Sequence, residues 1–219
     1  PVGRYLPGFP VEGEQTVTLR HCFTHTSGLS GHGEWGGLQN PWLDNVIAVG
    51  VGYLQPGRVR EYNGMGLDLA GKVMESVAGK GILRLMHEDF FAPLGLAHVG
   101  VSDLGGHMHC TAEDLARIGQ LLANRGAYGD QVFFTQATLD KLMPIPLGSV
   151  YPGISSDWGV GIAWMREPHP NAGQDGIPED ATLLGRNVIG HGAASSSIFR
   201  VDLDNNLVIV QTRNETGRD

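Results

Sequence analysis

The spacing of apolar residues changes near residue 150, and this change constrains the possible fold more than any other feature of the sequence. Before it, apolar residues recur every three or four positions, as on one helix face in residues 64–78. After it, short apolar runs such as residues 207–210 stand between polar turns, which is typical of strands. Helices followed by strands predict an α+β fold, with a mainly helical subdomain over residues 1–150 and the strands of an α/β subdomain over residues 151–219.

Capping and turn residues predict where the elements begin and end. Thr111 precedes Asp114 by three residues, a candidate capping box, and Gly126 would stop that helix. Residues 18–26 predict a helix closed by Gly28, because glycine tolerates the left-handed conformation at helix ends. Further helices are expected over residues 41–48, 64–78, 82–90 and 135–143, and strands over residues 158–164, 187–191, 195–202 and 207–212. The last strand is apolar on both faces, so we expect it to lie centrally in a sheet covered on both sides.

Composition argues against several classes of protein. A hydrophobic share of 41% and a charged share of 17% over 219 residues fit an ordered globular chain. A net charge of −8 with few lysines argues against nucleic-acid binding, which needs clustered basic residues. The apolar runs are far shorter than a bilayer-spanning helix, and the first residues have no signal-peptide pattern, so we expect no membrane span.

The cysteines and their neighbouring histidines raise two further questions. Cys22 and Cys110 could form at most one internal disulfide, and free, buried thiols are the default expectation. His107 and His109 would point to one side of a strand next to Cys110, which invites a zinc interpretation. No further ligand at a suitable spacing is legible, so we predict no metal and no other cofactor.

Seven short strings follow one another along the chain. They are Tyr5-Leu6-Pro7, His25-Thr26-Ser27-Gly28-Leu29, Tyr62-Asn63-Gly64, Phe91-Ala92-Pro93-Leu94-Gly95, Thr111-Ala112-Glu113-Asp114-Leu115, Trp158-Gly159-Val160-Gly161 and Gly190-His191-Gly192. Their order resembles that of the class C-like branch of the serine beta-lactamase and penicillin-binding-protein superfamily, over nearly the whole chain. The resemblance implies a beta-lactamase/transpeptidase-like fold, with a helical subdomain and an antiparallel sheet flanked by helices. It also implies a packed, hydrogen-bonded role for His25.

The nucleophile of that superfamily is missing from this sequence. A Ser-x-x-Lys at a helix start supplies its attacking serine and an adjacent amine. The residues three positions before Lys72, Lys80 and Lys141 are Leu69, Val77 and Thr138. Thr138 has the right spacing but belongs to a capped surface-helix pattern that the family places far from its site. The resemblance therefore implies a C-terminal portion whose N-terminal part is missing, and we expect this chain alone to be inactive.

Tyr62 matches the tyrosine that relays protons in the family. A phenol with an ordinary pKa is a poor base at neutral pH and needs a neighbouring cation, which the missing lysine would supply. The alternative is a half-buried tyrosine that packs beside Pro56 and Gly57. The family's asparagine position is occupied by Gly64, with Asn63 displaced by one, so Asn63 is only a candidate substrate contact.

His191 matches the lysine of the family's Lys-Thr-Gly strand, where histidine is a known alternative. A lysine is a fixed cation, whereas histidine is largely neutral at pH 7 and can donate or accept a hydrogen bond. The alternative is a strand-end histidine satisfied by backbone groups. Gly192, Ala193 and Ala194 follow as candidate substrate and oxyanion contacts, with the Ala194 N–H at the position that completes the oxyanion hole in the family. Histidine in place of the family's lysine at position 191 argues against a dedicated beta-lactamase.

Two functions remain open. The first is part of a serine hydrolase that acts through an acyl-enzyme on a beta-lactam, a D-amino-acid peptide or an ester, and the second is a non-catalytic binding or scaffold protein of the same fold. We expect Tyr62 and His191 to face one cleft. The expected partners are a small-molecule or peptide substrate and the missing N-terminal segment, which should cover apolar sheet surface. The resemblance favours a periplasmic or secreted location.

Overall fold

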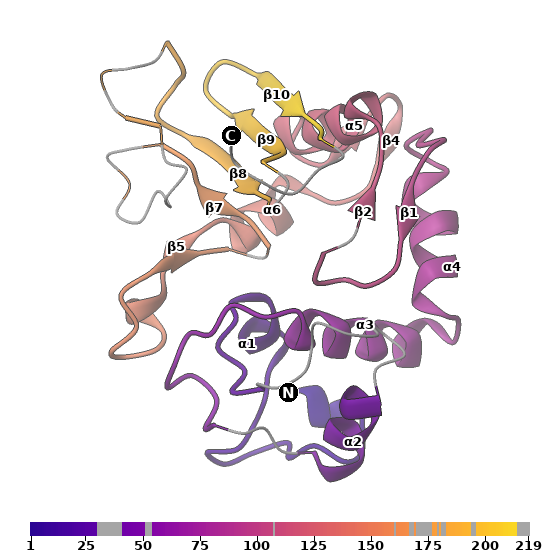
Figure 1. Cartoon of the computed structure of the whole chain (residues 1–219), viewed down its shortest axis with the longest axis vertical. Helices are drawn as coiled ribbons and strands as arrows, with labels where there is room; N and C mark the ends of the chain where they lie inside the picture. Colours follow the sequence, from indigo (N-terminus) through magenta and orange to yellow (C-terminus); the bar gives the residue numbers. More distant parts are fainter. Residues whose placement is uncertain are drawn as a thin grey trace. The chain divides into compact units, whose positions relative to one another are not determined.

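The structure is a computed structural model that describes residues 1–29, 41–50, 54–106, 108–159, 161–166, 169, 177–178, 180, 183–193 and 196–213. The chain divides into two compact units (Figure 1). The first comprises Pro1–Phe90, Gly100–His109 and Val150–Ile154, and the second comprises Phe91–Val99, Cys110–Ser149 and Ser155–Asp219. Both units combine segments from before and after residue 150, and the subdomain limits expected from the sequence stay a prediction.

Helices dominate the first unit. They are α1 (Leu19–Phe23), α2 (Pro41–Val49), α3 (Met65–Ala78) and α4 (Ile82–Met86), with a 3-10 turn at Val2–Arg4, a π-helical turn at His87–Phe91 and a hairpin of β1 (Gly100–Val101) and β2 (Met108–His109). The predicted limits of α2 and α3 are confirmed to within one residue. The helix predicted over residues 82–90 instead changes into the π-helical turn after Met86.

The core of the first unit lies where α1 and α2 pack against α3. Its buried side chains are Val2, Phe9, Val17, Cys22, Leu29, Leu43, Val46, Met65, Leu69, Ala70 and Val73. Gly66 brings α3 so close to α1 that a Cβ there would stand 2.9 Å from the Cys22 carbonyl oxygen. Met74 and Val77 are 38% and 67% exposed, so the predicted apolar face of α3 is buried only in the half that α1 covers.

Helix α1 is shorter than the sequence predicts. Thr18 caps its start and accepts a hydrogen bond from the His21 N–H at 3.1 Å. The helix ends at Phe23 rather than Thr26, because His25 takes the left-handed conformation with φ of 58°. The Thr26 N–H then donates to the His21 carbonyl at 2.9 Å, which closes a Schellman motif.

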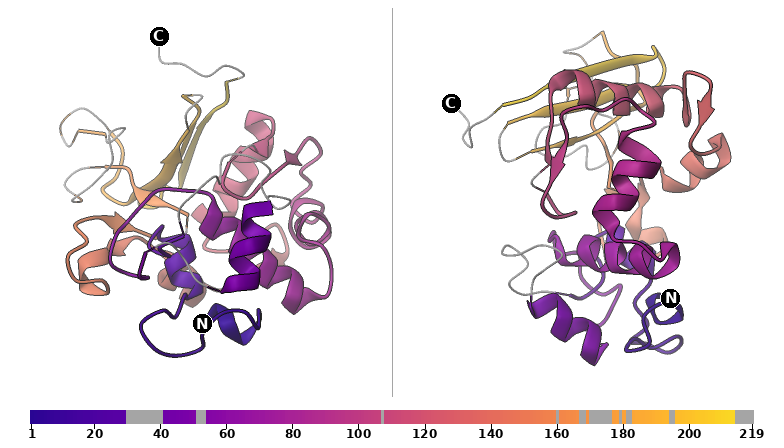
Figure 2. Two further views of the ribbon diagram at one scale, coloured as in Figure 1. Left: turned by 60° about the horizontal axis from the view of Figure 1, so that its bottom comes forward. Right: turned by 90° about the vertical axis from the view of Figure 1, so that its right-hand side faces the viewer.

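A four-stranded antiparallel sheet forms the centre of the second unit. Its order is β10 (Leu207–Gln211), β9 (Ile198–Asp202), β8 (Val188–Gly192) and β7 (Ala163–Trp164). Helix α5 (Ala112–Ala123) packs against β9 and β10 on one face, as Figure 2 shows. The described remainder contains α6 (Gln136–Leu142), a 3-10 turn at Leu147–Ser149 and the short strands β3 (Ala127–Tyr128), β4 (Gln131–Val132), β5 (Ile145–Pro146) and β6 (Asp157–Trp158). Helices with antiparallel sheets confirm the α+β prediction.

The predicted central position of residues 207–210 is wrong for the described sheet. Strand β10 is its edge and pairs with β9. Only one face of β10 is covered by α5, where a Cβ at Gly119 would lie 2.4 Å from the Val208 side chain. Leu207 and Ile209, on the other face, are 43% and 37% exposed. Two apolar side chains of β10 are therefore exposed on one face, and their cover by a missing segment stays a prediction.

Helix starts in the second unit match the sequence better than element ends do. Thr111 caps α5 by accepting the Asp114 N–H at 3.1 Å. Helix α5 ends at Ala123, because Arg125 takes the left-handed position after the C-cap, with φ of 57°, and Gly126 follows with φ of 104°. The strand predicted over residues 158–164 is split into β6 and β7 by a turn in which Gly161 has φ of 70°.

The cysteines are free thiols. Cys22 is fully buried, and burial raises its pKa to about 12. Cys110 is half-buried, and burial raises its pKa as well, so both thiols are poor nucleophiles at neutral pH. His107, the first member of the considered zinc trio, lies outside the described residues.

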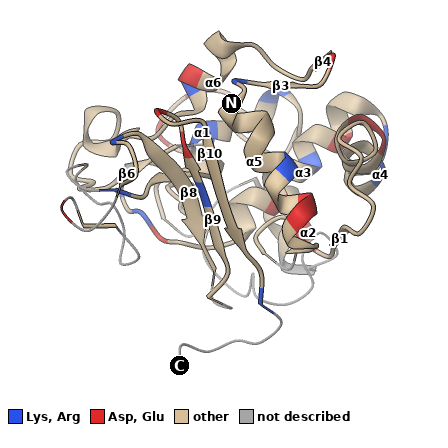
Figure 3. Cartoon of the chain, turned by 90° about the horizontal axis from the view of Figure 1, so that it is seen from above, with Lys and Arg blue, Asp and Glu red and all other residues tan. Residues whose placement is uncertain are grey.

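Charged residues are spread over the described chain. Acidic and basic residues are dispersed over helices and strands, and much of the ribbon carries neither (Figure 3). Among the residues that the structure describes, no helix combines the length and apolar character that a bilayer crossing requires.

Candidate functional site

The loop that carries Tyr62 is built on a buried string of residues that follows α1. The four residues 24–27 are at most 4% exposed. Three backbone hydrogen bonds join the loop to this string and to Gly28, from Leu54 N–H to Gly28 O at 2.9 Å, from Gly57 N–H to Thr26 O at 2.8 Å and from Glu61 N–H to His25 O at 2.9 Å. The loop has no regular secondary structure, and these hydrogen bonds to a buried segment hold it in place along its length.

His25 joins the string to Tyr62 directly. Its Nδ1 lies 3.0 Å from the Asn63 carbonyl oxygen and 3.4 Å from the Asn63 nitrogen, so either tautomer of the ring meets that peptide group. The imidazole also contacts the Tyr62 ring, with centroids 4.3 Å apart and planes inclined by 40°. The expected packed, hydrogen-bonded role of His25 agrees with these contacts.

The Tyr62 side chain stays accessible in this setting. It is 55% exposed, although its ring rests on a histidine that is only 4% exposed. Partial burial raises the pKa of the phenol, and the positive charge of Arg60 acts in the opposite direction. Burial lowers the pKa of Arg60, and Tyr62 raises it. A cation therefore stands beside Tyr62, two positions earlier in the chain, where the sequence argument looked only for a lysine.

Asn63 and Gly64 explain how this loop departs from the family pattern. The Asn63 side-chain amide donates to the Glu61 carbonyl at 2.9 Å, a local bond within the loop. A Cβ at Gly64 would lie 3.1 Å from the Cα of Gly105. The segment around Gly105 is fixed in turn, because the Leu104 N–H donates to the buried Asp68 carboxylate at 3.0 Å. Close packing therefore favours glycine at position 64, and the substrate contact of Asn63 stays a prediction.

His191 lies near the end of β8 in the second unit. It pairs with Phe199 of β9, and the preceding Gly190 comes so close to β9 that a Cβ would stand 2.0 Å from the Phe199 carbonyl oxygen. The His191 ring meets Trp158 edge-on, with centroids 5.7 Å apart. Its Nδ1 also makes a short contact with the carbonyl of Gly192, where β8 ends.

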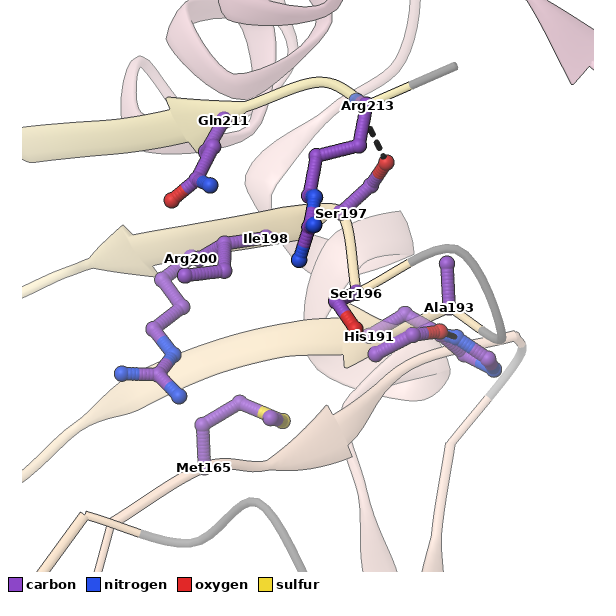
Figure 4. Close-up of a pocket in the computed structure, with 10 residues that line it drawn as sticks. Met165, His191, Ala193, Ser196, Ser197, Ile198, Arg200, Gln211 and Arg213 are labelled. Carbon is purple, nitrogen blue, oxygen red and sulfur yellow. Dashed lines mark hydrogen bonds between the residues drawn. The ribbon is translucent and has the colours of Figure 1, made fainter. Parts of the chain in front are cut away.

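A pocket of about 400 Å³ lies beside this strand end (Figure 4). His191, Gly192 and Ala193 line it together with Met165, Ser196, Ser197, Ile198, Arg200, Gln211 and Arg213. Its charged lining residues are two arginines, and none of the lining residues is a carboxylate. The Arg213 N–H donates to Ser197 Oγ at 3.2 Å and ties the end of β10 to the wall of the pocket. Sequence reasoning did not find these arginines, because nothing local marks them.

The predicted site residues fall into two groups. Tyr62 and Asn63 share one loop of the first unit, and His191, Gly192 and Ala193 share one pocket of the second. Ala193 also accepts a hydrogen bond from the Ser196 N–H at 2.9 Å. Ala194 lies outside the described residues. The convergence of Tyr62 and His191 on one cleft, and the catalytic roles of all these residues, stay predictions.

Comparison with known proteins identifies the family. Bacillus subtilis (strain 168) has a candidate penicillin-binding protein, PbpX, that is 33% identical, with 98% of this chain and 58% of PbpX covered. The chain thus spans little more than half of that relative. A penicillin-binding protein homolog from Caulobacter crescentus (19% identity, TM-score 0.69, 99% of this chain and 70% of that chain) and a family VIII carboxylesterase (16%, 0.69, 100% and 70%) have the same fold. Residues 1–219 match the Beta-lactamase family throughout, and the chain belongs to this family.

Proposed function

We propose that this chain is part of a serine hydrolase that acts through an acyl-enzyme on an amide or ester bond. The observation that carries the proposal is the setting of Tyr62, which is 55% exposed although its ring contacts that of a nearly buried histidine. Packing alone does not explain an aromatic side chain that contacts a nearly buried histidine and is still more than half exposed to solvent. The substrate class is a beta-lactam, a D-amino-acid peptide or an ester, and the similarity to a penicillin-binding protein and to a carboxylesterase supports the first and the last of these.

Tyr62 is proposed to carry protons. Its phenolate would accept the proton of an attacking serine hydroxyl while the serine oxygen bonds to the substrate carbonyl, and the phenol would then protonate the leaving group. Phenolate forms more easily beside a positive charge, and the charge of Arg60 acts in that direction. Burial outweighs this charge and raises the pKa of the phenol overall, so Arg60 offsets only part of the cost of forming phenolate.

His191 and the residues after it are proposed to face the substrate. A neutral imidazole there could donate a hydrogen bond to the substrate or accept one from it, in place of the fixed cation of the family's lysine. Gly192 and Ala193 lie at the end of β8, where strand backbone becomes available to a ligand. Asn63 is kept as a further substrate contact, and the backbone N–H of Ala194 as the oxyanion donor.

The nucleophile has to come from outside these 219 residues, because no serine stands three positions before a lysine. We therefore expect this chain alone to make no acyl-enzyme. The same absence, together with Gly64 at the asparagine position, favours the second candidate, a non-catalytic binding or scaffold protein.

Acylation of the full-length protein that contains this chain separates the two candidates. A fluorescent penicillin and an activated ester would each be incubated with that protein and with residues 1–219, and covalent adducts would be detected by intact-mass spectrometry. We expect an adduct on the full-length protein and none on the 219-residue chain. Tyr62→Phe should slow acylation about 100-fold to 10,000-fold, whereas Tyr5→Phe, at another exposed tyrosine of the same unit, should stay within about twofold.

The other possible outcomes of the acylation experiment also decide between the candidates. No adduct on the full-length protein with either reagent would support the binding or scaffold function. An adduct on residues 1–219 would show that the chain holds its own nucleophile, and equal rates for wild type and Tyr62→Phe would remove Tyr62 from the mechanism.

A further inference from the structure

His25 occupies a position that normally selects glycine. It follows the C-cap of α1 in the left-handed conformation, with φ of 58°. For a residue with a Cβ this conformation costs roughly 1–2 kcal/mol, and glycine or asparagine is usual at this point of a helix end. A histidine kept here must therefore make interactions that offset the cost.

Three interactions of His25 lead to one short segment, residues 61–63. Its carbonyl accepts the Glu61 N–H at 2.9 Å, its ring contacts the Tyr62 ring, and its Nδ1 meets the Asn63 peptide group. One residue thus holds three consecutive residues that lie 36 to 38 positions away in the sequence.

The backbone on either side of His25 is fixed independently. Thr24 Oγ1 donates to the Arg20 carbonyl at 2.7 Å, and the Thr24 and Thr26 hydroxyl oxygens lie 2.9 Å apart in the buried interior. The Thr26 carbonyl accepts the Gly57 N–H at 2.8 Å. The backbone that carries the imidazole is therefore held by its own neighbours as well as by residues 61–63.

We propose that His25 is a positioning residue for Tyr62, which holds the phenol in one rotamer above the loop. His25 is 4% exposed and is not expected to touch a substrate, so it acts only through Tyr62. The value of this positioning for catalysis rests on the proposed function, because it assumes that Tyr62 carries protons. The positioning itself is a property of the 219-residue chain and can be measured without any activity.

The test uses two variants and a matched control. His25→Asn and His25→Gly tolerate the left-handed backbone but remove the ring. Arg125→Asn is the control, because Arg125 holds the same position after α5, with φ of 57° and with Schellman bonds from Arg125 N–H to Leu122 O at 3.0 Å and from Gly126 N–H to Leu121 O at 2.9 Å. Arg125 lies in the other unit.

The primary readout is the Tyr62 side chain, observed by NMR of chain labelled with ¹³C and ¹⁵N and assigned with Tyr62→Phe. Three-bond couplings to Cγ should report one χ1 rotamer in wild type and in Arg125→Asn, and averaged rotamers in both His25 variants. The phenol pKa should also move downward, toward its ordinary value, when the ring loses its buried support.

A second readout addresses catalysis in the full-length protein. His25→Asn should lower the acylation rate about 10-fold to 100-fold through misplacement of the phenol, and should cause no further loss when Tyr62→Phe is already present. If Tyr62→Phe leaves the rate unchanged, the proposed function fails while the couplings still decide the positioning. Unchanged Tyr62 couplings in the His25 variants overturn the inference, and so does failure of both variants to fold, because His25 would then be a core residue only.

Discussion

Tyr62 stands on a loop without regular secondary structure, whereas His191 stands in the regular hydrogen-bond ladder of β8. The loop donates backbone hydrogen bonds to the carbonyls of the segment that follows α1. The His25 side chain of that segment also contacts the Asn63 peptide group of the loop. The strand gains its order from its neighbours, and Gly190 allows β9 to come very close. Order around Tyr62 therefore depends on hydrogen bonds to one buried segment and on the His25 side chain, whereas order around His191 depends on the close approach of two backbones.

Gly190→Ala tests the strand side of this comparison and should have the largest effect. The added Cβ would meet the Phe199 carbonyl oxygen at 2.0 Å, and the other nearest atoms are also backbone, so no side chain can move aside. We expect the free energy of unfolding to fall by about 3 kcal/mol or more. Urea denaturation followed by circular dichroism would measure it. Gly100→Ala is the control, because no atom lies within 4 Å of its new Cβ, and equal midpoints for the two variants would contradict the prediction.

Gly64→Asn tests the loop side by placing the family's residue where this chain has glycine. Gly64 has φ of −80°, so asparagine meets no backbone strain, but its Cβ would lie 3.1 Å from the Gly105 Cα. We expect a loss of about 1–2 kcal/mol in the same denaturation assay. Gly64→Ala should lose a similar amount, because the Cβ causes the clash. If asparagine stabilises the protein instead, the segment around Gly105 moves freely and the loop is less constrained than its contacts indicate.

Local signals in the sequence were reliable where the cause of a structure is local. Thr111 and Thr135 each accept the N–H of the residue three positions later, and the helices begin where these caps predict. The predicted end of α1 is wrong, because the chain already turns at His25, and the Asn63 peptide group that His25 contacts lies 38 residues away in the sequence. The edge position of β10 also depends on which strands pair, a fact that its apolar sequence does not contain.

The same limit applies to the candidate site. Tyr62 and His191 are predicted as site residues because each stands inside a short sequence motif of the family pattern. Arg60 could have been suspected from its two-residue spacing to Tyr62, since the pair shares one loop. Arg200 and Arg213 come to His191 through strand register, which no local pattern reveals.

His21 should make the first unit sensitive to acid. Its neutral Nδ1 accepts the Thr18 N–H at 3.1 Å, and burial lowers its pKa from 6.5 to about 4. A lowered pKa means that the stabilisation is complete above pH 6.5 and is lost as the pH falls toward 4, by about 1–2 kcal/mol after allowance for solvent screening. His21→Gln should keep the capping box without titrating. The stability of wild type relative to this variant should therefore fall by that amount between pH 7 and pH 4, and a constant difference would refute the titration.

Buried carboxylates differ between the units. Burial would raise the pKa of Asp202 in the second unit, but the N–H groups of Gly185, Asp204 and Asn205 and the Asn205 side chain donate to it and hold its pKa below the ordinary value. Asp68 in the first unit accepts the Leu104 N–H at 3.0 Å, and burial raises its pKa from 3.8 to about 6. Of these two buried carboxyls, the one in the first unit therefore has the higher pKa.

The smallest effect expected is the net response of wild type to acid through His21 and Asp68. A raised pKa means that the stabilisation by Asp68 is complete below pH 3.8 and is lost as the pH rises through 6, the opposite sign to His21 over nearly the same range. Their sum should change by less than about 1 kcal/mol between pH 4 and 6.5. Asp68→Asn keeps an oxygen that accepts the Leu104 N–H, and it leaves His21 as the titrating group of the pair. The stability of this variant should therefore fall as the pH falls. The stability of His21→Gln should rise as the pH falls, and the stability of the double variant should change least with pH. Urea denaturation of the four proteins at pH 4, 5 and 6.5 would measure the free energy of unfolding. If this free energy changes with pH in the same direction in both single variants, the two groups do not oppose each other.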